Sequence, residues 1–141
     1  MKVVKILLIL LVAYVGVVVV FESLLGYFQP AGESTLVLAT EEDDGSTHER
    51  VLSRLESGGQ LYVAANHWPR AWYYRALENP AVEVTVDGTT RDYVAEPVTG
   101  DEHQRLDDEH RLGPVIRILT GFPPRRFIRL ESAAAQGAGS D

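Results

Sequence analysis

Aromatic and cationic side chains crowd into one short stretch of this sequence, residues 64–80, which reads AANHWPRAWYYRALENP. Both tryptophans of the chain, Trp68 and Trp72, lie in it beside His67 and Arg70. Aromatic faces next to fixed positive charges can bind a flat, anionic ligand by stacking and by ion pairing. An apolar run precedes the stretch, so we expect a strand-to-helix junction whose free backbone N–H groups add to an anion site.

Each aromatic residue of this stretch also has a purely structural interpretation. Large aromatic side chains dominate protein cores, and Trp72 could simply dock the predicted helix on a sheet. His67 could be an axial haem ligand, but a lone exposed histidine is usually no ligand. A flavin or haem nevertheless remains an alternative flat, anionic ligand for this stretch.

A second group of cations lies upstream, in residues 48–55. His48, Arg50 and Arg54 occupy alternate positions there and would share one face of a strand. That face could be an anion-binding wall beside the helix. It could equally be a solvated face whose charges are balanced by neighbouring glutamates.

Composition excludes several other kinds of site. The chain has 141 residues, no cysteine and a net charge of −7, so disulfides, thiolate metal sites and a dominant nucleic-acid-binding patch are excluded. The acidic run at residues 41–44 lacks the spacing of a calcium-binding loop. His103 and His110 lie seven residues apart on a polar helix, too far apart for one ion, and we expect both at the surface. We predict no metal site.

The N-terminal segment is apolar from residue 3 to residue 21 except for Lys5, close to the ~20 residues that span a bilayer. A cleaved signal peptide is the rival interpretation, but this run exceeds the usual ~7–15 residues and no A-x-A site follows it. We expect an uncleaved single-pass anchor in a bacterial inner membrane. Lys2 and Lys5 precede the span, which favours a periplasmic domain by the positive-inside rule.

Four regions are expected along the chain: an anchor with an interfacial segment (1–28), a linker (29–34), one folded domain (35–131) and a disordered tail (132–141). Strands are predicted at 35–40, 48–55 and 61–65 as an antiparallel meander, at 81–86 and 89–98 as a hairpin, and at 125–130. Helices are predicted from residue 69 to about 78, and over about 102–111 behind a cap at Thr99. Residues 115–119 are apolar and of uncertain type. The pattern favours a mainly β domain with two or three helices, folded as a small barrel or a strongly bent sheet.

From residue 35 to residue 130 the chain resembles the deazaflavin-dependent nitroreductase family, small split β-barrels related to the FMN-binding pyridoxamine-phosphate oxidase fold. The residues that carry the resemblance are 64–66 (AAN), 69–73 (PRAWY), 77–80 (LENP), Val84, Val86, Gly88 and 99–102 (TGDE). The resemblance implies a split barrel whose groove binds the deazaflavin F420 and passes a hydride to a nitro compound, quinone or enone. By position, Asn66, Trp72 and Tyr73 match residues that the family places around the cofactor, and Tyr73 could supply a proton.

One turn departs from the family pattern. Residues 40–46 read TEEDDGS where family members carry a basic T-G-R-K-S-G turn that grips the cofactor's phosphate and tail, and His48 stands near a family arginine. The leading hypothesis is a membrane-anchored oxidoreductase acting on quinone-like or nitroaromatic substrates. The alternative is a non-catalytic, envelope-facing binding module that has lost F420. Family split barrels often dimerise, so a homodimer is possible.

Overall fold

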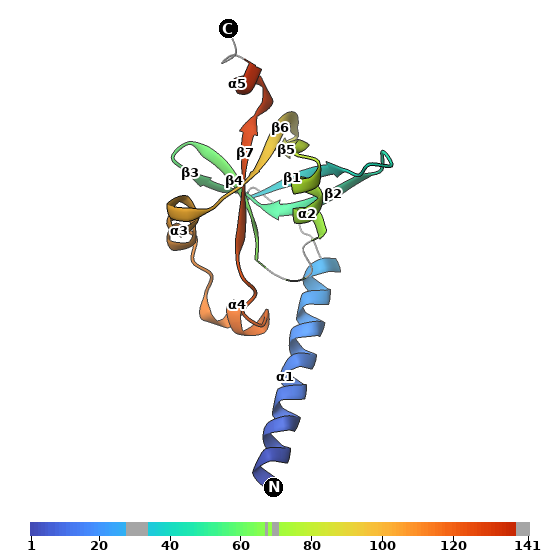
Figure 1. Cartoon of the computed structure of the whole chain (residues 1–141), viewed down its shortest axis with the longest axis vertical. Coiled ribbons are helices and arrows are strands. Elements are labelled where there is room, and N and C mark those ends of the chain that lie inside the picture. The colour runs from blue at the N-terminus through green and yellow to red at the C-terminus, as the bar shows by residue number, and fades with distance from the viewer. Residues whose placement is uncertain (28–33, 67, 69–70, 138–141) are drawn as a thin grey trace.

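The computed structural model describes residues 1–27, 34–66, 68 and 71–137 of the chain. A long N-terminal helix, α1 (Lys2–Tyr27), extends away from a domain built around a curved sheet (Figure 1). The strands are β1 (Thr35–Glu41), β2 (Thr47–Ser53), β3 (Leu55–Ser57), β4 (Gln60–Ala65), β5 (Ala81–Val86), β6 (Thr89–Pro97) and β7 (Arg126–Ser132). The other helices of the described part are α2 (Ala71–Glu78), α3 (Gly100–Glu109), α4 (Pro114–Leu119) and α5 (Ala133–Gly137).

The strands form one antiparallel sheet in the order β2-β1-β5-β6-β7-β4-β3. Its two edge strands, β2 and β3, are separated in sequence only by Arg54. The nearly continuous segment 47–57 therefore pairs with β1 through β2 and with β4 through β3. Because it joins the two edges of the sheet, the sheet curves towards a closed barrel. The prediction of a mainly β split barrel behind an apolar helix is confirmed.

The expected three-stranded meander over residues 35–65 is wrong. β4 pairs with β3 and β7 rather than with β2. Gly58 and Gly59, with φ of 58° and 78°, form the tight turn that folds β4 back onto β3. Hairpin turns can be identified from sequence, but the pairing of β4 with β7 joins residues more than sixty positions apart.

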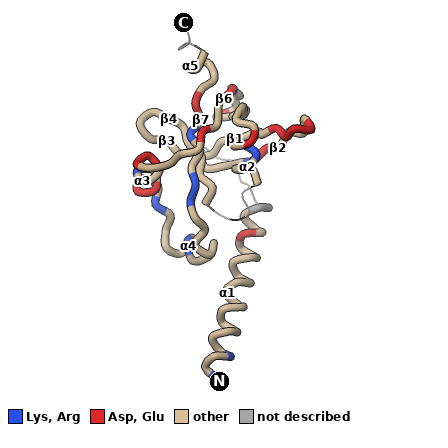
Figure 2. Tube along the Cα trace, viewed as in Figure 1, with Lys and Arg blue, Asp and Glu red and all other residues tan. Residues whose placement is uncertain are grey.

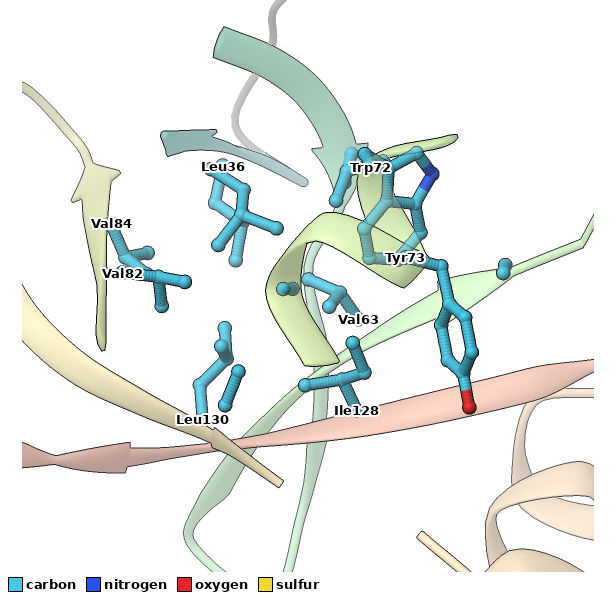
Figure 3. Packing of buried hydrophobic residues seen from close by; sticks show 13 residues of the cluster. Leu36, Val63, Trp72, Tyr73, Val82, Val84, Ile128 and Leu130 are labelled. Atoms are coloured by element: carbon cyan, nitrogen blue, oxygen red, sulfur yellow. The ribbon is translucent and has the colours of Figure 1, made fainter. Parts of the chain in front are cut away.

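The main core lies where α2 packs against the strands (Figure 3). Apolar side chains from six strands and α2 meet there, and Leu38, Val63, Ile128 and Leu130 are fully buried. A second cluster faces the other side of the sheet, because neighbouring residues of a strand point to opposite faces. In this cluster Leu106 of α3 packs on side chains of β4 and β7, so α3 covers the outer face of the barrel.

A charged group, the Glu102 cluster, fastens α3 to the sheet. The Tyr62 hydroxyl donates to Glu102 Oε1 at 2.7 Å, and Arg129 Nη1 donates to Glu102 Oε2 at 2.9 Å. Arg129 also pairs with Glu96. The hydrogen bond from Tyr62 and the charge of Arg129 hold the pKa of Glu102 below its ordinary value. The Glu102 cluster therefore joins strands β4, β6 and β7 to helix α3.

Three helical details differ from expectation. Thr99 occupies the N-cap position of α3, but its side chain makes no capping hydrogen bond. The apolar segment 115–119 belongs to the short helix α4, which begins at Pro114, a residue suited to the first helical turn. Residues 133–137 form the short helix α5 within the expected disordered tail, because consecutive alanines have the highest helix propensity. Residues 138–141 lie outside the described part.

Helix α1 is long and apolar enough over Lys2–Leu25 to cross a bilayer, a property it shares with signal sequences. Acidic residues gather at the tip of the β1–β2 hairpin and on α3, whereas α1 is uncharged between Lys5 and Glu22 (Figure 2). The Tyr14 hydroxyl of α1 donates to the Ile118 carbonyl oxygen of α4 at 2.7 Å. The helix and the domain are therefore in direct contact.

Candidate functional site

Helix α2 carries the aromatic residues of the predicted strand-to-helix junction. Trp72, Tyr73 and Ala76 form its buried face. Trp72 is only 4% exposed and meets Tyr73 edge-on with ring centroids 6.0 Å apart. Trp72 therefore packs the helix onto the sheet, which is the structural alternative that the sequence left open.

Tyr73 belongs to the same core and is only 5% exposed. Figure 3 shows its hydroxyl pointing away from the labelled apolar side chains. Its ring meets Tyr74 edge-on at 5.5 Å, and the guanidinium carbon of Arg126 lies 5.7 Å from the ring centroid. The phenol ring is therefore packed between the apolar core and a cation.

Asn66 follows β4 directly and borders a cavity of about 710 Å³. This cavity, called here the Asn66 cavity, lies between α3, α4 and the residues that lead into β7. Arg125 Nε donates to Asn66 Oδ1 at 2.9 Å, and Arg125 Nη1 pairs with Asp107 at 2.7 Å. The Arg125 guanidinium also stacks 4.8 Å from the Phe127 ring centroid, so the cation is held on three sides.

His103 lines the Asn66 cavity as well. Its Nε2 lies 3.0 Å from the Arg125 carbonyl oxygen, and its ring meets Phe127 edge-on at 5.1 Å. The expectation that His103 and His110 are surface residues is wrong, because both are half-buried. The reason for His103 is that α3 packs against β7, a contact between elements distant in sequence.

A second polar group, the Arg75 cluster, lies between α2 and the β1–β2 hairpin and consists of Glu42, His48, Arg50 and Arg75. Glu42 Oε1 lies 3.2 Å from His48 Nε2 and 3.5 Å from Arg75 Nη1. Burial, and secondarily the charge of Arg75, lower the pKa of Arg50. Within the described residues, the buried Nε of Arg75 has no hydrogen-bond partner. These four residues bring together two guanidinium charges and one carboxylate, while Asp44 of the same hairpin also interacts with His48.

The acidic turn between β1 and β2 forms hydrogen bonds within itself and with the end of α2. Asp44 Oδ1 accepts a hydrogen bond from the Ser46 backbone N–H at 2.8 Å. Hydrogen bonds from the side chain and then the backbone of Ser46 lower the pKa of Asp44. Asn79 Nδ2 donates to the Glu41 carbonyl oxygen at 2.8 Å and reaches Asp43 Oδ1 at 3.4 Å. The turn thus anchors the end of α2.

The predicted site residues fall into separate groups in the structure. Asn66 joins the cavity, Trp72 and Tyr73 both belong to the core, and His48 and Arg50 join the Arg75 cluster. Trp68 is 41% exposed, and His67 and Arg70 lie outside the described residues. No cluster of three potential metal ligands occurs in the part of the chain that the structure describes.

Two arginines of the site were missed by the sequence reasoning. Arg75 stands in the aromatic stretch itself, one helical turn beyond Trp72, and its position on α2 was a usable signal. Arg125 had no such signal, because its partner Asn66 lies 59 positions away in the sequence.

Comparisons with known proteins agree with this architecture. Among solved structures, a protein described as a domain-swapped dimer matches with a TM-score of 0.58 and 20% identity, covering 72% of this chain and 82% of its own. The F420-H2-dependent reductase FDR-A matches with a TM-score of 0.55 and 20% identity, covering 68% and 93%. The haem storage protein HutZ from Vibrio cholerae matches with a TM-score of 0.51 and 23% identity, covering 71% and 82%. At these identities the matches show the fold alone.

Curated proteins give no significant match. The sequence model of the F420H(2)-dependent quinone reductase family matches residues 18–113, which is more than half of the chain and includes every strand from β1 to β6 together with α2 and α3. The chain therefore belongs to the F420H(2)-dependent quinone reductase family.

Proposed function

We propose that this protein is a membrane-anchored oxidoreductase that uses reduced F420 to reduce quinone-like or nitroaromatic compounds. Membership of the F420H(2)-dependent quinone reductase family is the observation that carries the proposal. The similarity to the split-barrel reductase FDR-A supports it at the level of the fold.

The residues of the Arg75 cluster fit an anionic cofactor tail. Arg75 Nη1 lies 3.5 Å from the carboxylate of Glu42, Arg50 lies near Arg75, and Arg75 keeps a buried Nε without a partner among the described residues. Arginine binds phosphate and carboxylate groups with paired N–H donors. We assign the tail to Arg50 and Arg75, with His48 as a third contact.

Bound F420 in its reduced form supplies a hydride, that is, a proton and two electrons. Reduction of a quinone to a hydroquinone needs one further proton. The Tyr73 hydroxyl is the group that we assign to hold or deliver it, because its ring is clamped between the core and Arg126. Asn66, fixed by its hydrogen bond from Arg125, supplies an amide that can orient a polar group. Trp72 acts through packing, since it is buried.

The same proposal includes an anchor in a bacterial inner membrane. Helix α1 is long enough to span once, and its exposed apolar side chains have no protein partner along most of its length. Lys2 and Lys5 favour a cytoplasmic N-terminus and a periplasmic domain. A reporter fused after Asp141 tests the orientation directly. Light scattering in detergent tests the proposed homodimer.

The test of function uses the full chain in detergent. Titration with F420, FMN and haem, followed by absorbance and fluorescence, should show F420 bound most tightly. Addition of a water-soluble quinone to the reduced complex should restore the absorbance of oxidised F420. Failure of all three ligands to bind would sink the proposal.

A non-catalytic binding module is the second candidate, and the acidic β1–β2 turn favours it. Glu41, Glu42, Asp43 and Asp44 stand where the resembled family carries basic residues. This candidate predicts that F420 binds weakly or not at all, or that it binds without being oxidised by any quinone. Tyr73→Phe separates the two candidates, because it should slow quinone reduction at unchanged F420 affinity only in an enzyme.

A further inference from the structure

Exposed apolar side chains gather in one segment of the domain, residues 114–122, which is called here the α4 turn. Val115, Ile116, Ile118 and Phe122 are all exposed, with Val115 at 65% and Phe122 at 57%. In the described residues outside α1, the other exposed large apolar side chains are Trp68 and Tyr74. Such a concentration on one surface marks an interaction site rather than ordinary surface variation.

The α4 turn lies beside the middle of α1. The Tyr14 hydroxyl donates to the Ile118 carbonyl oxygen at 2.7 Å, and Gly121 approaches so closely that an added Cβ would lie 3.0 Å from Val18 Cγ1. At 1.5 Å per residue, Tyr14 is about 18 Å from Lys2 and about 20 Å from Tyr27. Hydrocarbon in a bilayer is ~30 Å thick. If α1 spans the bilayer, the α4 turn therefore lies at least partly at the depth of the hydrocarbon.

The charges of this region also suit a lipid surface. Residues 113–127 contain Arg117, Arg125 and Arg126 but no acidic residue, in a chain whose net charge is −7. Figure 2 shows acidic residues at the β1–β2 tip, on α3 and near β6 and β7. Asp107 and Asp108 of α3 line the Asn66 cavity, and Asp107 pairs with Arg125. Arg117 and Arg126 are therefore the arginines of this region without a carboxylate partner among the ion pairs of the described residues. An apolar turn with nearby arginines is the composition of a segment whose apolar side chains enter an anionic membrane while its long cationic side chains reach towards the headgroups.

We propose that the α4 turn inserts into the bilayer next to α1 and forms a lipid-facing wall of the Asn66 cavity. Pro114, Ile118 and Phe122 line this cavity together with Asn66 and Arg125. Arg117 also lines it and lies with its guanidinium carbon 5.7 Å from the Phe122 ring centroid, so its charge has a polar space to occupy. The inference rests on the proposed anchor and narrows the substrate to lipid-soluble quinones that enter from the membrane.

Depth measurements with single cysteines test the insertion, since the chain has no cysteine of its own. Val115→Cys, Leu10→Cys in α1 and Glu49→Cys on the exposed face of β2 would each carry an environment-sensitive fluorophore. The full-length proteins are placed in vesicles of phosphatidylcholine and phosphatidylglycerol that contain nitroxide-labelled lipid. We expect a blue shift and strong quenching at positions 115 and 10, and neither at position 49.

The outcomes separate this inference from the proposed function. Quenching at position 10 with water-like emission at position 115 would overturn the insertion and leave the anchor standing. Water-like emission at both positions would overturn the anchor as well. Reduction of a water-soluble quinone by the same preparations in detergent reports independently on the catalytic proposal.

A substrate comparison tests the lipid-facing wall. Val115 and Ile116 do not line the cavity. The double variant Val115→Ser, Ile116→Ser should lose activity towards a long-tailed quinone in vesicles and keep its activity towards a short, water-soluble quinone. The control, Val115→Leu, Ile116→Leu, retains the apolar surface and should retain both activities. Equal effects on the two quinones, or no effect on either, would overturn entry from the membrane.

Discussion

Replacement of Glu42 by glutamine should strengthen binding of an anionic cofactor tail at the Arg75 cluster. Glu42 is the carboxylate closest to the cations of this cluster, 3.2 Å from His48 Nε2 and 3.5 Å from Arg75 Nη1. It neutralises part of the charge that would attract the ligand. The substitution keeps the size of the side chain and removes only the negative charge.

The magnitude follows from Coulomb's law. Two unit charges about 6 Å apart interact with ~0.7 kcal/mol at the dielectric constant of water and ~2.8 kcal/mol at an effective value of ~20. Every ~1.4 kcal/mol is a factor of ten in affinity, so removal of the repulsion should tighten binding by about threefold to hundredfold. Glu42 is 42% exposed, which favours the lower part of this range.

The assay is a titration of the full chain with F420, followed by the change in its fluorescence, at low and high salt. Glu49→Gln is the matched control, because Glu49 is an exposed residue of β2 with the same charge. The gain should shrink at high salt, since screening weakens interactions of exposed charges. Arg75→Met should weaken binding. If Glu42→Gln binds no more tightly than Glu49→Gln, the Arg75 cluster does not hold the cofactor tail.

Three further predictions concern the framework around the site. Trp72→Ala should lower the free energy of unfolding by about 3–5 kcal/mol in denaturant titrations, because the ring is buried. Trp72→Phe should lower it much less. Near-native stability of the alanine variant would contradict the packing role. Gly121→Ala should lower the free energy of unfolding by about 1–2 kcal/mol in the same titrations and loosen α1 from the domain, because φ is +73° and the new Cβ would press on Val18. The control is Gly113→Ala, which should be close to neutral because Gly113 has open space around it and a φ of −60°. The lowered pKa of Glu102 means that its ionised form stabilises the fold above the unfolded-state pKa and that this contribution disappears as pH falls through the folded-state value. Glu102→Gln should therefore be destabilising at neutral pH and should progressively lose this effect as the pH falls below the ordinary glutamate pKa and through the lower folded-state value. An equal loss of stability at neutral and at strongly acidic pH would argue against the ionic role.

Local features of the fold could be read from the sequence because their causes are local. The hairpin between β5 and β6 turns at Asp87-Gly88, and Asp87 adopts the positive φ of 50° that such turns require. Helix α2 ends at Glu78, just before Asn79-Pro80, as the proline predicts. The apolar run at the N-terminus forms α1 with the expected length.

Features that join distant segments could not be read in this way. The sequence places Asn66 and Arg125 in different elements, and only the pairing of β4 with β7 brings their side chains together. The sequence places Glu42 in an acidic run, and only the packing of α2 brings Arg75 within 3.5 Å of its carboxylate. Spacing along a chain predicts which residues share a face of one element, but not which faces of two elements meet.

The position of β7 in the sheet constrains the order in which the domain can fold during synthesis. β7 lies between β6 and β4, although it follows every other strand in the chain. Before its synthesis, the strands β2-β1-β5-β6 and the hairpin β3-β4 have no hydrogen-bonded connection to each other. At ~5–20 residues per second, the ~100 residues from β1 to β7 take about 5–20 s to make. A nascent chain must therefore pass through that interval with an open core that its own fold cannot yet shield from solvent.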